Sequence, residues 1–565
     1  MRWQSFIKCI PMKTKLICIT TTVVLIYLIS SYALLEHASF NSTEINNNAH
    51  SPNKSVKLQN VIVHLDLKGS PPKLSYLETI LPKLQMLGVT GLLIEYEDMF
   101  PYDGKLVNLS ARNCYERHKL QEFLTLAVHV GFDIIPLVQT FGHLEYALKL
   151  PEFRNLREML QFPDSICPSK YGSLLLIREM LKQVIELHQN IAPLKYLHIG
   201  CDEVFHINKC QQCKLRNHTN TKIYLSHVKE VTDIVKALSA NTTVLVWDDM
   251  FRKIPVNVWD STKLPAAELV YWDYEPDVKV SHINLMKYHK TSNNIWIASA
   301  FKGADGRTKT FPDMVHRFSN HFSWMNFISD YKFGGEANVF EFRGIILTGW
   351  SRYSHLDPPC ELLPTSLPSL YLNLLLIKRF QDGISSEEYN LADVFDKYLN
   401  DNLTHSLHCS GFLNLEYIDT SQCYFDGNEL YLILKRWEII KGDILNAIND
   451  DENGLYSIDY YSKSKNVNIN NLQRNIDWTN DSLNQIENLK VEMVKALTHY
   501  YDMNFVSEYV DFKFYNTHKM LQDLIKSLNS MLKVRSWSRR PYINWIPFVI
   551  TESSYLISEV AFLLL

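Results

Sequence analysis

Eight short apolar runs, alternating with amphipathic segments, limit the folds open to residues 58–381 more than any other feature. The runs are apolar almost throughout, which is typical of parallel strands covered on both faces. The segments between them carry apolar residues at three- and four-residue spacing, which indicates helices. The expected strands are 61–66, 91–96, 133–138, 196–199, 243–248, 268–273, 294–299 and 344–350, and the expected helices are 74–87, 116–130, 173–189, 221–238, 281–288, 311–330 and 366–380.

This alternation predicts an α/β fold, a (β/α)8 TIM barrel over residues 58–381, because eight strand–helix units close a parallel sheet. An open doubly wound sheet is the alternative, although no glycine-rich phosphate loop follows the first strand. Helical spacing continues over 430–448, 483–501 and 505–532. Residues 382–565 are therefore predicted to form an α-helical C-terminal region that packs on the barrel or pairs chains into an oligomer, with 543–565 as a packing segment.

The N-terminus predicts a membrane anchor. Residues 16–35 are uncharged and mostly apolar, and several lysines and an arginine precede them. A helix of twenty residues spans about 30 Å, the thickness of a bilayer core, and positive charge keeps its flank cytoplasmic. We expect a cytoplasmic tail (1–15), a transmembrane signal anchor (16–35) and a flexible stem (36–57), with the rest in the lumen of the secretory pathway, such as the Golgi. A cleaved signal peptide, giving a secreted protein, is the alternative.

Cysteines and glycosylation sequons agree with a lumenal location. Ten cysteines suit a protein with a few disulfides, whose connectivity stays open. Cys210 and Cys213 have the spacing of half a zinc site or a redox pair, but no second CxxC or CxxH follows, which favours a local disulfide or free thiols. The net charge of -4 and the lack of a basic tract beyond the N-terminus predict no nucleic-acid partner. Sequons begin at Asn41, Asn53, Asn108, Asn217, Asn241, Asn402 and Asn480.

Polar and aromatic side chains follow the ends of the expected strands, which in a barrel meet at one mouth. Asp202 and Glu203 are adjacent after the fourth strand; two such carboxylates repel, and the drier one tends to hold its proton, as a general acid must. Indole rings stack on sugar rings, and carboxylates pair with hydroxyls, so this set predicts a sugar-binding site. The other candidates for this site are Asp66, Glu95, His143, Trp247, Asp248, Trp272, Tyr274 and Trp350.

Five motifs resemble those of glycoside hydrolase family 20, the β-N-acetylhexosaminidases: residues 92–102, 135–143, 198–203, 271–274 and 349–353. The resemblance implies an exo-acting, retaining enzyme that removes terminal β-linked N-acetylglucosamine or N-acetylgalactosamine from glycans, with the substrate's acetamido group as the nucleophile. It implies that Glu203 is the general acid and base and that Asp202 orients the acetamido group. Tyr274 would donate to the acetamido oxygen, and Trp247, Trp272 and Trp350 would enclose the sugar.

The chain departs from this family at the end of the first strand, where many members carry an arginine and this sequence has Asp66-Leu67-Lys68. An ammonium group is a point charge without the planar fork of a guanidinium. No metal or organic cofactor is expected. Two other functions remain open: a non-catalytic carbohydrate-binding barrel, and a membrane-anchored scaffold that uses the C-terminal helices.

Overall fold

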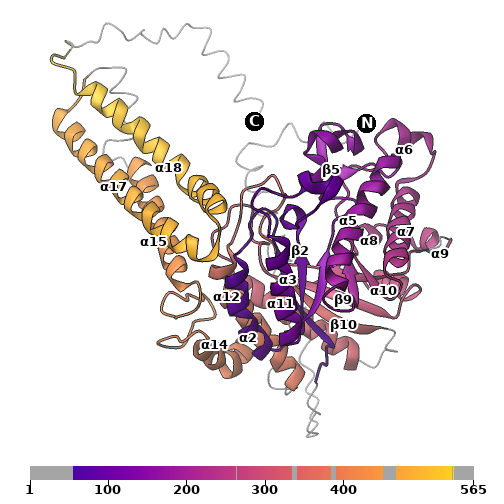
Figure 1. Ribbon diagram of the computed structural model, residues 1–565. Helices are drawn as coiled ribbons and strands as arrows, with labels where there is room; N and C mark the ends of the chain where they lie inside the picture. Colours follow the sequence, from indigo (N-terminus) through magenta and orange to yellow (C-terminus); the bar gives the residue numbers. More distant parts are fainter. Residues whose placement is uncertain are drawn as a thin grey trace, which may run out of the picture. The chain divides into compact units, whose positions relative to one another are not determined.

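The computed structural model of the protein describes residues 55–261, 264–333, 340–383, 390–449, 466–537 and 539 (Figure 1). In these segments no helix is long and apolar enough to cross a membrane. The predicted tail, anchor and most of the stem (residues 1–54) lie outside the described residues, as does the apolar stretch 543–565.

Eight parallel strands close into a barrel in the order β1-β10-β9-β8-β7-β6-β3-β2. Each pair of neighbours is parallel, as in the register of Leu65 with Ile94. The predicted barrel and all eight predicted strands are therefore confirmed. The strands are β1 (Asn60–Asp66), β2 (Gly91–Glu95), β3 (Asp133–Leu137), β6 (Tyr196–His198), β7 (Thr243–Trp247), β8 (Ala267–Trp272), β9 (Asn294–Lys302) and β10 (Glu341–Gly349).

The strands are apolar on both faces because each face contacts a different core. Ile62 of β1 points into the barrel interior, where it joins a cluster with Leu93 and Trp296. Its neighbours Val61 and Val63 belong instead to the large core that the strands share with the surrounding helices. Alternation of polar and apolar residues is therefore absent, as expected for a parallel sheet buried on both sides.

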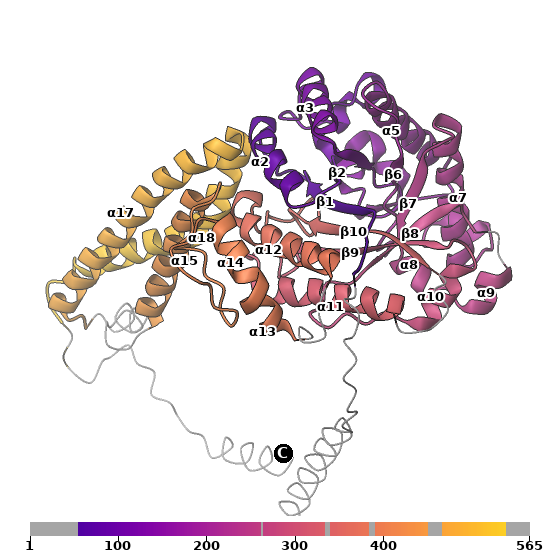
Figure 2. The same ribbon diagram turned by 90° about the horizontal axis from the view of Figure 1, so that it is seen from below.

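Helices surround the barrel on its outside (Figure 2). In α7 the buried residues Val228, Val231 and Val235 recur at helical spacing, and the Thr219 side chain caps the helix by accepting the backbone N–H of Lys222 at 3.2 Å. All seven predicted barrel helices are present: α2 (Leu74–Met86), α3 (Arg117–Val130), α5 (Tyr171–Gln189), α7 (Asn220–Leu238), α10 (His282–His289), α11 (Met314–Phe333) and α12 (Leu363–Asp382).

Short elements in the loops between strands and helices were not predicted, because three to six residues carry too little periodicity. One of them is an antiparallel hairpin, β4 (Arg157–Met159) and β5 (Phe162–Ile166), between β3 and α5. The other short elements are η2 (Glu97–Met99), η3 (Gly104–Leu109), α4 (Glu145–Leu148), η4 (Pro151–Leu156), α6 (Gln211–Leu215), α8 (Asp249–Arg252) and α9 (Val256–Ser261).

The C-terminal region is helical in its described parts, and its helices contact the barrel. Tyr500 stacks edge-on against Tyr76 of α2 at 4.8 Å between ring centroids, and the backbone N–H of Lys73 donates to the Tyr500 carbonyl at 2.7 Å. The prediction that these helices pair chains stays a prediction. The helices are α13 (Leu391–Val394), η5 (Phe395–Leu399), α14 (Asn400–Ser406), α15 (Asn428–Asn449), α17 (Ile469–Tyr500) and α18 (Met503–Met531).

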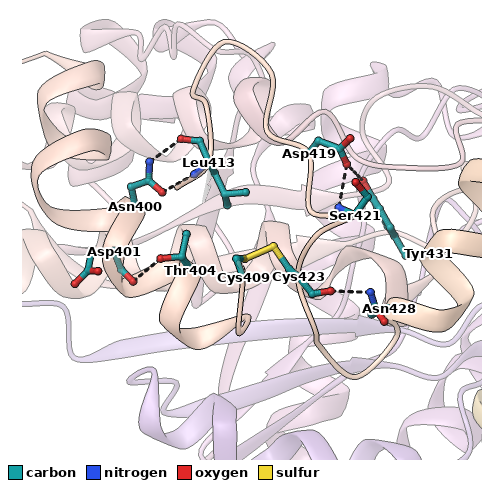
Figure 3. Close-up of a disulfide and its surroundings, with 10 residues drawn as sticks. All are labelled: Asn400, Asp401, Thr404, Cys409, Leu413, Asp419, Ser421, Cys423, Asn428 and Tyr431. Atoms are coloured by element: carbon teal, nitrogen blue, oxygen red, sulfur yellow. Dashed lines mark hydrogen bonds between the residues drawn. A yellow bond between two sulfur atoms is a disulfide. The ribbon is translucent and has the colours of Figure 1, made fainter. Parts of the chain in front are cut away.

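One disulfide, Cys409–Cys423, closes the loop between α14 and α15 (Figure 3). Hydrogen bonds fix both ends of this loop. The Asn400 side chain donates to the carbonyl of Leu413 at 2.6 Å, and the Asn428 side chain donates to the carbonyl of Cys423 at 2.7 Å. The disulfide therefore stabilises a loop that is already tied to the helices on either side.

Candidate active site

The loop that follows β6 has an unusual backbone, which aims its two carboxylates into the barrel mouth. Positive φ angles occur at Gly200 (66°), Cys201 (68°) and Glu203 (44°), and at the neighbouring His143 (52°). A Cβ atom on Gly200 would lie 1.9 Å from Oε1 of Gln139, so any other residue would have to displace that side chain as well as adopt a strained φ. Non-glycine residues with such angles are uncommon and gather at functional sites, where the surroundings hold them.

Two hydrogen bonds hold this loop in place. The Tyr224 hydroxyl donates to the carbonyl of Cys201 at 3.0 Å, and the backbone N–H of Glu203 donates to Oδ2 of Asp249 at 3.1 Å. Asp249 is buried, and burial together with the nearby Asp202 raises its pKa to about 7. The loop is thus fixed from α7 and from the start of α8.

His143 lies between the two carboxylates. Its Nε2 atom is 3.4 Å from Oδ2 of Asp202 and 3.4 Å from Oε2 of Glu203. The Asp202 side chain is 11% exposed and that of Glu203 is 42% exposed, so Asp202 lies deeper. The structure thus brings the two predicted catalytic residues and the predicted histidine into one cluster.

The charges of this cluster correct one expectation from the sequence. Burial would lower the pKa of His143, but Asp202 and Glu203 outweigh it and raise that pKa to about 10. Burial raises the pKa of Asp202, whereas the hydrogen bond from His143 lowers the pKa of Glu203. The drier carboxylate is therefore Asp202, and its pKa is the one that is raised. The pKa of Glu203, the predicted acid, is lowered in the free protein.

A cavity of about 420 Å³ opens beside this cluster, within the range of small-molecule sites. The predicted residues Trp247, Trp272, Tyr274 and Trp350 all line it, together with the acid pair and His143. The remaining lining residues are Lys68, Gln139, Arg252, Asp273, Glu275, Gly303, Ala304, Arg352 and Tyr353.

The aromatic side chains of the cavity support one another. The Trp247 and Trp350 rings meet at 6.0 Å between centroids, and Trp272 stacks on Tyr274 at 5.2 Å. Trp350 Nε1 donates to the Tyr274 hydroxyl at 3.1 Å. The apolar walls of the cavity therefore have fixed orientations, and a sugar ring would meet them with little loss of side-chain freedom.

Asp66 and Glu95 do not line the cavity; they hold Lys68, which does. Both carboxylates are buried, and Lys68 Nζ lies 3.3 Å from Oδ2 of Asp66 and 3.7 Å from Oε1 of Glu95. Burial would raise the pKa of Glu95, but Lys68 and His64 outweigh it and lower that pKa to about 2. The Lys68 ammonium also lies 5.2 Å from the ring centroid of Trp350. These two acids act on the cavity through Lys68.

Asp248 is likewise absent from the cavity lining. Its buried carboxylate accepts two hydrogen bonds of 2.6 Å from Arg252 and one of 3.0 Å from the Tyr288 hydroxyl. Arg252 in turn lines the cavity and lies 5.2 Å from the ring centroid of Trp272. Asp248 therefore positions an arginine that the sequence interpretation did not include.

Several lining residues were not among the predicted site residues, although the sequence held a signal for some. Lys68 and Arg352 stand at strand ends, and Gln139 precedes His143 within a matching motif. Arg252 lies four residues after Asp248, the spacing of a helical ion pair. Glu508 of α18 contacts Arg352 at 2.7 Å, and no local pattern indicates that long-range contact.

The fold and the site define a glycoside hydrolase built on a (β/α)8 barrel. The catalytic-domain model of glycosyl hydrolase family 20 matches residues 81–287. Hexosaminidase D from Homo sapiens is 41% identical over 350 residues, which cover 60% of this chain and 70% of that protein. Hexosaminidase D from Bos taurus is 40% identical over 343 residues, which cover 59% of this chain and 96% of that protein. The chain therefore belongs to glycosyl hydrolase family 20, as its motifs predicted.

A solved structure described as a β-N-acetylhexosaminidase from Bacteroides fragilis NCTC 9343 is also similar, at 14% sequence identity and a TM-score of 0.46. The match covers 62% of this chain and 71% of that one.

Proposed function

We propose that the protein is an exo-β-N-acetylhexosaminidase that removes terminal β-linked N-acetylhexosamine from glycans by a retaining, substrate-assisted mechanism. Membership of glycosyl hydrolase family 20 and the two relatives named hexosaminidase D support this activity. In such a mechanism the substrate's own acetamido oxygen attacks the anomeric carbon, so the protein supplies no nucleophile. Its side chains instead orient the acetamido group and move a proton.

One observation carries the proposal: Asp202 offers a buried acceptor that has no hydrogen-bond partner among the described residues. That acceptor is Oδ1, while Oδ2 faces His143 at 3.4 Å. A buried carboxylate oxygen without a donor is costly, and the acetamido N–H of a bound sugar would supply the donor. Asp202 would thereby turn the acetamido oxygen toward the anomeric carbon and stabilise the positive charge of the cyclic intermediate.

Glu203 is the proposed general acid, and substrate binding would adjust its pKa. In the free protein the imidazolium of His143 keeps the pKa of Glu203 low. A sugar in the cavity would cover the partly exposed Glu203 and remove water from it, which favours the neutral form. Glu203 would then protonate the leaving oxygen and, in the second step, take a proton from the incoming water.

The aromatic side chains would hold the sugar in place. Trp247, Trp272 and Trp350 would enclose the ring and the acetamido methyl group, and the Tyr274 hydroxyl would donate to the acetamido oxygen. Lys68, which lines the same cavity, would donate to the sugar's outer hydroxyls. Arg352 also lines the cavity, but it already donates to the carbonyls of Lys68, Gly69 and Asp357, so its main role would be to hold this wall in place. The two acids behind Lys68 fix its position, which partly makes up for the absence of an arginine at the end of β1.

The test is hydrolysis of the 4-nitrophenyl N-acetyl-β-D-glucosaminide and N-acetyl-β-D-galactosaminide by the purified full-length chain. We expect turnover of at least one sugar. Asp202→Asn should lose orders of magnitude in kcat. Glu203→Gln should lose more with a poor leaving group than with 2,4-dinitrophenolate, because only the former needs protonation. His206→Gln, a change in the same loop at a residue that does not line the cavity, is the matched control: any loss caused by a looser loop should be equal for the good and the poor leaving group.

Two results would contradict the proposal. Equal losses in Glu203→Gln for good and poor leaving groups would remove Glu203 from the acid role. Binding of N-acetylglucosamine by a folded chain without turnover at any pH would favour a non-catalytic carbohydrate-binding barrel.

We also propose that the barrel faces the lumen of the secretory pathway, anchored through residues 16–35 or released by cleavage. The disulfide Cys409–Cys423 supports an oxidising compartment. The acceptor residues of the five sequons within the described segments are exposed: Asn108, Asn217, Asn241, Asn402 and Asn480. A mobility shift on enzymatic deglycosylation of the protein from cells would support the proposal, and a barrel digested by protease in intact microsomes would contradict it.

A further inference from the structure

Four side chains outside the cavity converge in a way that no sugar chemistry requires. Glu158 of β4, Cys167 just after β5, and Cys210 and Cys213 at the start of α6 form this cluster. One ligand atom from each lies within 4.8 Å of every other. Glu158, Cys167 and Cys213 are buried, and Cys210 is half-buried. Figure 1 shows β5 and α6 at the same end of the barrel.

The distances within this cluster approach those around a tetrahedral metal ion. Cys167 Sγ lies 3.3 Å from Cys210 Sγ and 3.5 Å from Cys213 Sγ. Cys213 Sγ lies 3.3 Å from Oε2 of Glu158. With Zn–S bonds of about 2.3 Å and Zn–O bonds of about 2.1 Å, tetrahedral geometry separates two sulfurs by about 3.8 Å and a sulfur from an oxygen by about 3.6 Å. These three pairs need shifts of a few tenths of an ångström to fit the ion, and the remaining pairs, all within 4.8 Å, need shifts of about 1 Å at most.

Backbone groups donate hydrogen bonds that orient the ligands. Oε1 of Glu158 accepts the backbone N–H groups of Lys209 at 2.5 Å and Cys210 at 2.8 Å, which leaves Oε2 directed to the thiols. The Sγ atom of Cys210 accepts the backbone N–H of Cys213 at 3.3 Å. Such bonds fix the direction of a carboxylate or thiolate ligand before the metal arrives.

The cluster is short of positive charge. Glu158 is only 3% exposed, yet within the described segments no lysine, arginine or histidine forms an ion pair with it. A buried carboxylate is ordinarily paired with a cation or bound to a metal. None of the three cysteines is in a disulfide, so all three sulfurs remain available as ligands.

We propose that these four side chains bind one Zn²⁺ ion in a closed structural site. Three thiolates and one carboxylate give the tetrahedral set that zinc prefers, with the same total charge as a four-cysteine site. A thiolate-rich set disfavours magnesium and calcium, which prefer oxygen ligands, and the carboxylate disfavours copper(I). Four protein ligands leave no open position for substrate, so the ion would stabilise the fold and take no part in bond cleavage.

The site would fix the loop that carries the proposed catalytic acid. Cys210 follows Glu203 by seven residues, and the zinc would join this loop to the β4–β5 hairpin that follows β3. A second contact joins the same two segments, since Nδ1 of His206 lies 2.9 Å from Oδ2 of Asp164. We expect zinc removal to lower the thermal midpoint and kcat together, because the same loop positions Glu203.

The test is the metal content and metal environment of the purified full-length chain. We expect about one zinc per chain by elemental analysis. X-ray absorption at the zinc edge should show three sulfurs at about 2.3 Å and one oxygen at about 2.0–2.2 Å. Cys167→Ser and Cys213→Ser should lose most of the zinc. Cys114→Ser, a half-buried free cysteine outside the cluster, should keep it.

Three outcomes would overturn the proposal. One is a folded chain that takes up no zinc when refolded with it. Another is a mass spectrum of the alkylated, unreduced protein that shows two of the three cysteines joined in a disulfide. The third is a zinc environment of nitrogen and oxygen alone. Because the absorption spectrum and mass spectrum use the unmutated chain, a variant that fails to fold does not affect the result.

Discussion

Replacing His143 by glutamine should move the whole pH profile of kcat/KM to higher pH. The histidine is an imidazolium; its charge lowers the pKa of Glu203 and offsets part of the rise that burial causes in the pKa of Asp202. The imidazolium lies 3.4 Å from each carboxylate. At that distance two unit charges interact with an energy of about 1.2 kcal/mol in bulk water and about 4.9 kcal/mol at an effective dielectric constant of 20. Glutamine keeps an N–H donor and removes the charge.

The bulk-water value applies to Glu203, because its side chain is 42% exposed. Loss of that interaction energy corresponds to a rise of about 0.9 units in the pKa of Glu203. The sign follows from the role of each carboxyl. Glu203 must be protonated, so a higher pKa keeps it active to higher pH and moves the basic limb up by at least about one unit. Asp202 must be ionised, so its higher pKa moves the acidic limb up as well.

The measurement is the pH dependence of kcat/KM on a chromogenic N-acetyl-β-D-hexosaminide for the unmutated chain, His143→Gln and His206→Gln. The control removes a histidine that is paired with Asp164, and its limbs should stay in place. A His143→Gln profile that keeps its basic limb, or loses activity at lower pH than the parent, would refute the electrostatic reasoning.

Three further predictions concern stability. Gly142→Ala should lower the free energy of unfolding by about 1–3 kcal/mol and also lower kcat, because the new Cβ would lie 2.4 Å from the carbonyl oxygen of Asp202. An unchanged midpoint of urea unfolding would contradict this close approach. Replacing both Cys409 and Cys423 by alanine should lower the free energy of unfolding by about 3 kcal/mol, as expected for a loop of this size and measured by denaturant unfolding. If reductant leaves the unfolding midpoint of the unmutated chain unchanged, the disulfide is contradicted. The raised pKa of Asp249, about 7, means that the folded state binds more protons than the unfolded state between about pH 4 and 7, so stability falls as pH rises through that window. Asp249→Asn should therefore be more stable than the parent at pH 8 and about equal at pH 4, and parallel stability curves would contradict this.

The barrel could be predicted from the sequence because its signals are local. Each strand is a continuous apolar run, and each main helix has its own periodicity, so eight repeats identify the closed sheet without any long-range information. The β4–β5 hairpin was missed because three and five residues with mixed polarity have no such signal.

The site could be predicted only in part. The topology places strand ends at one mouth, which correctly brought His143 to Asp202 and Glu203. It does not determine which way each side chain turns there. Asp248 turns to Arg252, and Glu95 turns to Lys68 and His64, because a buried carboxylate is stabilised by contact with a basic side chain.

The cysteine cluster shows the same limit more clearly. Cys210 and Cys213 give half of a zinc pattern, but Cys167 precedes Cys210 by 43 residues and Glu158 precedes it by 52. No standard spacing joins these positions. Only the fold of the hairpin over the loop after β6 brings them together, so the sequence favoured a local disulfide or free thiols.

The most direct test of the proposed mechanism is the effect of fluorine on the substrate's acetamido group. Fluorine on the methyl carbon withdraws electrons from the carbonyl oxygen and weakens it as a nucleophile, and it leaves the amide N–H and C=O groups in place. If that oxygen attacks the anomeric carbon, kcat for 4-nitrophenyl glycosides should fall steeply from the acetyl through the mono-, di- and trifluoroacetyl substrates. A kcat that stays flat across the series would contradict substrate assistance and would require a nucleophile from the protein.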